Sequence, residues 1–130
     1  MAKAQKHILY VDDSAEDRQM YSHYLTGKGY RVSTAESGTA GLEKAFHQQP
    51  DLVLMDLWLP ELGGWQVCQC LKTDTRTKHI PVVIITGHSP LRPEVVGCEA
   101  MLTKPLSPER LLAEIVRVLP PADAAATGTN

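Results

Sequence analysis

No apolar stretch in this sequence of 130 residues approaches the roughly 20 residues that a membrane-spanning helix needs. The first residues, MAKAQKHILYVDD, contain no long apolar segment and no small-residue cleavage site, so they do not predict a signal peptide. Acidic and basic residues nearly balance, 15 against 13, and no run of Lys or Arg occurs. We therefore expect one globular domain that binds neither a membrane nor a nucleic acid.

Cysteine is also scarce. The three cysteines, Cys68, Cys70 and Cys98, are an odd number, which argues against a framework of disulfides. Cys68 and Cys70 lie two residues apart in a predicted helix, so they point in different directions, and no CxxC pair suggests a zinc site. We interpret all three as reduced packing thiols of a cytoplasmic protein.

Short apolar runs alternate with amphipathic stretches along the chain. Five runs are predicted as strands: His7–Val11, Tyr30–Thr34, Leu52–Met55 leading to Asp56, Pro81–Thr86 and Glu99–Thr103. Helices are predicted over Ala15–Thr26, from Ser37 or Gly38 to about Gln48, over Trp65–Leu71, and from Ser107 to about Leu119. This order predicts an α/β fold, a doubly wound five-stranded parallel sheet with helices on both faces.

Two regions depart from this regular order. Pro90 and Pro93 stand where the fourth helix should begin, which predicts a shortened or irregular helix, reduced to about Glu94–Gly97. Residues 122–130 are small and polar and predict a flexible C-terminal tail. The domain itself is therefore expected over residues 1–121.

Polar residues of complementary chemistry stand at the ends of four predicted strands. These residues are Asp12 and Asp13, Asp56, Thr86 and Lys104. Because the carboxyl ends of parallel strands share one edge of a sheet, we expect the five side chains to converge there. Facing carboxylates need a cation between them, and Mg²⁺ favours oxygen ligands. A carboxylate can also attack a phosphoryl group, whose oxygens a lysine and a hydroxyl can then neutralise.

The motifs LYVDDS, LVLMDLWLP, VVIITG and MLTKP resemble those of the receiver domains of response regulators, the CheY-like family of two-component signalling, over about residues 5–120. The resemblance implies a flavodoxin-like strand order of 2-1-3-4-5. It implies Asp56 as phosphoacceptor, and a Mg²⁺ site made of Asp13, Asp56 and the backbone carbonyl of Trp58, with Asp12 acting through metal-bound water.

The same resemblance assigns the remaining site residues and the partners. Thr86 and Lys104 would hold phosphoryl oxygens, and the Lys104–Pro105 peptide bond would be cis. The implied function is that of a signalling domain, not an enzyme. It is a stand-alone response regulator that takes a phosphoryl group from a histidine kinase or a histidine phosphotransfer protein and acts on a separate output protein.

Some positions depart from the family pattern. Met101 stands where the family usually has Tyr or Phe, and Thr86 and Lys104 are only 18 residues apart, about four fewer than usual. Trp58 and His88 are expected to flank the approach of water to the phosphoryl group, with Trp58 as an apolar shield.

Two other functions stay open at this point. The chain could be an interaction module of receiver fold that works without phosphorylation, as Met101 and the short fourth segment would allow. It could also be a small aspartyl-phosphate hydrolase, although such enzymes need an acid two residues after the nucleophile, where Trp58 stands.

Overall fold

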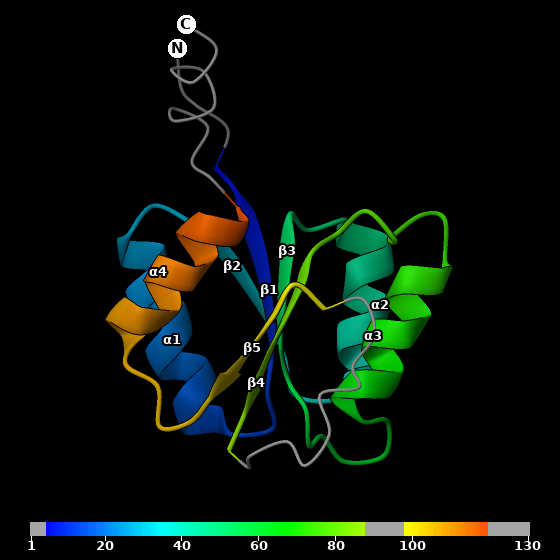
Figure 1. The fold of residues 1–130 in the computed structure, drawn as a ribbon, viewed down its shortest axis with the longest axis horizontal. Coiled ribbons are helices and arrows are strands. Elements are labelled where there is room, and N and C mark those ends of the chain that lie inside the picture. The colour runs from blue at the N-terminus through cyan, green and yellow to red at the C-terminus, as the bar shows by residue number, and fades with distance from the viewer. Residues whose placement is uncertain (1–4, 88–97, 120–130) are drawn as a thin grey trace, which may run out of the picture.

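Five parallel strands form the centre of the protein, in a computed structural model that describes residues 5–87 and 98–119 (Figure 1). The strands are β1 (His7–Val11), β2 (Arg31–Ala35), β3 (Leu52–Asp56), β4 (Val82–Thr86) and β5 (Ala100–Thr103). Their order in the sheet is β2-β1-β3-β4-β5, and every neighbouring pair is parallel. The predicted fold class and the predicted strand order are confirmed.

Burial on both faces explains the continuous apolar runs. Every residue of β1, β3 and β4 is buried, whereas the edge strand β2 begins on the exposed Arg31. In a parallel sheet whose two faces are covered, interior strands have no polar side to present to solvent.

Four helices are present in the described part of the chain: α1 (Ala15–Gly27), α2 (Gly38–Gln48), α3 (Gly64–Thr73) and α4 (Pro108–Val118). Three of them start at a serine cap. Ser14, Ser37 and Ser107 each accept a hydrogen bond from the backbone N–H three residues later.

The helices cover the sheet in two layers, with α1 and α4 on one face and α2 and α3 on the other (Figure 1). Alternate residues of each strand point to opposite layers. In β1, Leu9 and Val11 pack toward α2 and α3, whereas Ile8 and Tyr10 pack toward α1 and α4. Two apolar cores therefore hold the sheet between them.

Other predictions can be compared with the structure only in part. The Lys104–Pro105 peptide bond is cis, as expected. Cys68 is buried and Cys70 is exposed, and both are free thiols, as is Cys98. The predicted short helix at Glu94–Gly97 and the predicted tail at 122–130 lie outside the described residues. Among the residues that are described, no helix is long and apolar enough to cross a membrane.

Candidate functional site

The carboxyl edge of the sheet brings the predicted residues to one place. Asp12 and Asp13 follow β1, Asp56 and Thr86 end β3 and β4, and Lys104 follows β5. Asp56 is aligned with Ile85, so Thr86 extends one residue past it. The backbone N–H of Lys104 donates to the carbonyl of Thr86 over 2.7 Å, which ties the last two strand ends together.

Three carboxylates meet at this edge. Oxygen atoms of Asp12, Asp13 and Asp56 lie within 4.8 Å of one another. Asp12 and Asp56 are buried, while Asp13 is exposed, so the cluster opens to solvent on one side. A set of hard oxygen donors with open positions suits an ion such as Mg²⁺, which retains several of its waters.

Asp12 is held by donors on both of its oxygens. The hydroxyl of Tyr10 and the Nζ atom of Lys104 donate to Oδ2 over 2.6 and 2.8 Å, and the backbone N–H of Ser14 donates to Oδ1 over 2.9 Å. Burial alone would raise the pKa of Asp12, but these three hydrogen bonds together hold it below its ordinary value. Asp12 is therefore ionised and fixed in orientation.

Asp56 is bound less tightly. Its Oδ1 accepts one hydrogen bond of 3.1 Å from the backbone N–H of Trp58, and its Oδ2 lies 3.6 Å from Nζ of Lys104. Burial raises the pKa of Asp56, and the charges of Asp12 and Asp13 act in the same direction. This carboxylate is consequently more basic than an exposed aspartate, and its Oδ2 has no hydrogen bond within normal range from Lys104.

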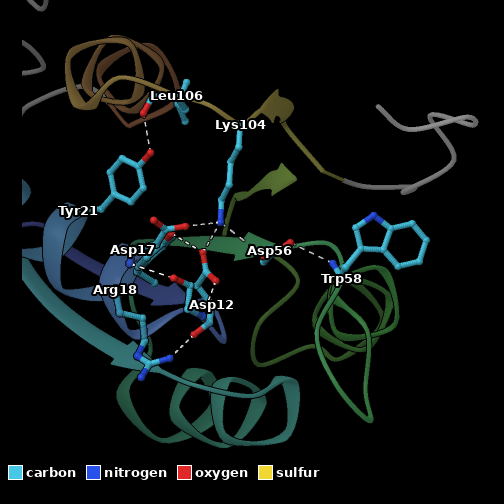
Figure 2. A network of polar contacts seen from close by, with 10 residues as sticks. Asp12, Asp17, Arg18, Tyr21, Asp56, Trp58, Lys104 and Leu106 are labelled. Carbon is cyan, nitrogen blue, oxygen red and sulfur yellow. Dashed lines mark hydrogen bonds and ion pairs between the residues drawn. The ribbon is translucent and has the colours of Figure 1, made fainter. Parts of the chain in front are cut away.

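Lys104 lies among several anions (Figure 2). Its Nζ atom is 2.8 Å from Oδ2 of Asp12 and 2.7 Å from Oδ2 of Asp17, closer than its 3.6 Å contact with Asp56. Burial would lower the pKa of Lys104, but hydrogen bonds to Asp12 and Asp17 outweigh it and raise the pKa. Lys104 is thus a permanent positive charge at this site.

The backbone of Asp56 is also confined from behind by α3. A Cβ atom at position 64 would lie 2.2 Å from the carbonyl oxygen of Asp56, so only glycine fits where the helix begins. The N–H of Gly64 donates to the carbonyl of Leu57 over 2.9 Å. Glycine therefore lets α3 start directly against the strand end that carries the acceptor.

Sequence reasoning missed three residues of this network: Tyr10, Asp17 and Arg18. The sequence did contain a sign of the role of Tyr10, because it is a tyrosine inside an apolar run and a buried hydroxyl needs a hydrogen-bond partner. Asp17 stands three residues after the Ser14 cap, at the acidic position of a capping box. Its carboxylate contacts Nζ of Lys104, which stands 87 residues further along the chain, so the local sequence gives no sign of this contact. Arg18 donates to the backbone carbonyl of Asp12 over 2.6 Å.

Other predicted residues are placed as follows. The side chain of Thr86 is buried at the site edge, and Met101 is half-buried against the core on the side of α2 and α3. Trp58 is 59% exposed, and its indole ring points away from the carboxylates (Figure 2). His88 lies outside the described residues.

Comparison with known proteins agrees with this arrangement. The doubly wound sheet and its acidic carboxyl edge are those expected of a CheY-like protein, and residues 8–116 match the response regulator receiver domain. The chain therefore belongs to the receiver domain family of response regulators, a signalling domain of two-component systems.

Two relatives show how much of each protein the match covers. The chain is 38% identical to the response regulator PleD of Caulobacter vibrioides over 112 residues. These residues are 83% of this chain but only 25% of PleD. The polar-differentiation response regulator DivK of Brucella ovis is 33% identical over 114 residues, which are 85% of this chain and 93% of DivK. The chain thus spans about a quarter of PleD and nearly all of DivK.

Solved structures show the same fold. The chemotaxis response regulator CheY4 of Vibrio cholerae superposes with a TM-score of 0.84 at 34% identity, covering 89% of this chain and all of CheY4. A CheY-like receiver domain protein of Methanospirillum hungatei gives a TM-score of 0.84 at 28% identity, over 89% of this chain and 94% of the other.

Proposed function

We propose that Asp56 accepts a phosphoryl group and that the chain thereby switches or relays a signal, within residues 1–121 as the receiver unit. The observation that carries the proposal is the placement of the Asp56 carboxylate between two other carboxylates and Lys104. Its raised pKa makes it a better nucleophile than an exposed aspartate, and its Oδ2 is not covered by a normal hydrogen bond from Lys104.

In the proposed reaction, Oδ2 of Asp56 forms a bond to phosphorus while the bond between phosphorus and the donor atom breaks. For a phosphohistidine donor, the electron pair of that bond stays on the imidazole nitrogen. The donor would be a histidine kinase or a histidine phosphotransfer protein, and a separate output protein would read the product, as membership of the family implies.

Several residues of the site are proposed to neutralise the charge of the phosphoryl group. Asp12, Asp13, Asp56 and the backbone carbonyl of Trp58 are the proposed holders of Mg²⁺, which supplies neutralisation of phosphoryl charge when it is bound. Lys104 contributes a fixed ammonium beside Asp56, and the buried Thr86 contributes a hydroxyl at the same sheet edge.

The test is incubation with MgCl₂ and acetyl phosphate, followed by intact mass measurement. We expect a gain of one phosphoryl group, which chelator or Asp56→Asn abolishes. Glu61→Gln is the matched control, since it removes an exposed acid from the loop that follows β3. Labelling that persists in Asp56→Asn would show a wrong acceptor. An unlabelled wild type would favour the phosphorylation-independent interaction module, and rapid turnover of the donor would favour a hydrolase.

A further inference from the structure

Asp17 is placed on α1, outside the cluster of three carboxylates, and yet makes the shortest ion pair with Lys104. The distance from Nζ is 2.7 Å to Asp17, 2.8 Å to Asp12 and 3.6 Å to Asp56. The first two are charge-assisted hydrogen bonds, whereas the third exceeds hydrogen-bond range. The ammonium is therefore bound more closely to Asp17 than to the acceptor.

The start of α1 explains why the Asp17 carboxylate is available. In a capping box, the acid at the third helical position accepts a hydrogen bond from the backbone N–H of the cap residue. Here the N–H of Ser14 already donates to Oδ1 of Asp12 over 2.9 Å. The backbone N–H of Asp17 completes the other half of the box by donating to Oγ of Ser14 over 3.2 Å. Its carboxylate consequently binds Lys104 instead.

We propose that Asp17 is a positioning residue for the metal site. As a second counterion of Lys104 beside Asp12, it holds the ammonium 3.6 Å from the carboxylate of Asp56, which stays open to a divalent cation. The inference rests on the proposed function, which assigns that cation to these carboxylates. Without Asp17, Lys104 keeps its contact with Asp12, and the next anion to Nζ among the described residues is Asp56, so the ammonium moves onto Asp56. An ammonium and a metal ion on the same oxygens repel each other.

A double-mutant cycle separates this competition from simple loss of charge. Asp17→Asn weakens Mg²⁺ binding both because one negative charge is lost and because Lys104 is released. Only the second effect requires Lys104. We therefore expect Asp17→Asn to raise the Kd for Mg²⁺ in the wild-type background. This fold increase should be about three to ten times the fold increase that Asp17→Asn causes in Lys104→Gln. The measurement is isothermal titration calorimetry with MgCl₂ at fixed pH and ionic strength.

Three further measurements support the cycle. Glu16→Gln removes a charge from the same turn of α1 at an exposed position, so its effect should be the same with and without Lys104. Asp17→Glu restores the counterion and should bring the Kd within about twofold of wild type. In the metal-free protein, Asp17→Asn should shift the ¹⁵N signal of Nζ of Lys104, and Glu16→Gln should leave it unchanged.

Each result decides between distinct conclusions. Equal effects of Asp17→Asn in both Lys104 backgrounds would overturn the positioning role while leaving the proposed function intact. A wild type that binds no Mg²⁺ would overturn the metal assignment of the proposed function, and this inference with it. If Asp17→Asn lacks a cooperative thermal unfolding transition, Asp17→Ser takes its place in the same cycle.

Discussion

The hydroxyl of Tyr10 and Lys104 Nζ donate to the same oxygen of Asp12, over 2.6 and 2.8 Å, from opposite ends of the chain. Tyr10 is fully buried, so its hydroxyl reaches the site from inside the core. The orientation of Asp12 is therefore determined by core packing as well as by the site itself.

Tyr10→Phe should destabilise the protein by about 1–2 kcal/mol at pH 7, because a buried carboxylate loses a donor. The folded state lowers the pKa of Asp12, so the stability it contributes is complete above the unfolded pKa near 4 and is lost as pH falls through the folded pKa. The loss on substitution should therefore shrink in acid. Urea unfolding at several pH values measures it.

Tyr30→Phe is the matched control for this test, because Tyr30 is also buried but donates no hydrogen bond to the described residues. An equal loss in both variants, or a loss for Tyr10→Phe that does not depend on pH, would refute the assigned role of the Tyr10 hydroxyl.

Asp56→Asn should stabilise the fold at neutral pH. Burial raises the pKa of Asp56, so ionisation of this carboxyl opposes folding once pH rises above the unfolded value near 4. The substitution removes that cost. We expect Tm to increase by a few degrees at pH 7 and the gain to vanish below about pH 4. Thermal unfolding with Glu61→Gln as control tests this; a lower Tm at pH 7 would contradict it.

Gly64→Ala should cost roughly 1–3 kcal/mol, because the added Cβ would lie 2.2 Å from the carbonyl oxygen of Asp56. Labelling by acetyl phosphate should also become slower, since α3 would displace the strand end. Gly27→Ala is the control, as its Cβ meets nothing within 4 Å. Similar denaturation midpoints for wild type and Gly64→Ala would show that α3 can shift freely.

Trp58→Ala should leave the lifetime of the phosphorylated protein within about twofold of wild type, a barrier change of about 0.4 kcal/mol. The indole is 59% exposed and points away from the carboxylates, so in this conformation it does not cover Asp56 (Figure 2). Trp65→Ala, at another exposed tryptophan, is the control. Tenfold faster decay of Trp58→Ala alone would instead support the shielding role predicted from the sequence.

Much of the fold was readable from the sequence because burial on both faces forces whole strands to be apolar. β1 was predicted with its observed bounds, and β3 was correctly expected to end at Asp56. Helix α3 was less predictable. The predicted helix began at Trp65 and stopped at Leu71, whereas α3 runs from Gly64 to Thr73. Glycine disfavours helix interiors locally, and here the tertiary approach to Asp56 requires it.

The site was predictable where it depends on topology alone. Strand ends share an edge, so Asp12, Asp13 and Asp56 could be expected to meet, and they do. The contact between Asp17 and Lys104 could not be anticipated, because it depends on the N–H of Ser14 donating to Asp12 and so leaving the Asp17 carboxylate available. Asp17 looks in sequence like an ordinary acid of a first helical turn.

The position of Lys104 has a consequence for the cooperativity of folding. The cation stands 92 residues after Asp12 and follows β5, which pairs with β4 at the edge of the sheet. Among the described residues, Lys104 is the only basic side chain paired with the carboxylates of Asp12 and Asp56. A partly folded sheet that lacks β5 therefore holds mutually repelling carboxylates without their cation. Pairing of β5 with β4 and neutralisation of the carboxylates are then a single event in folding.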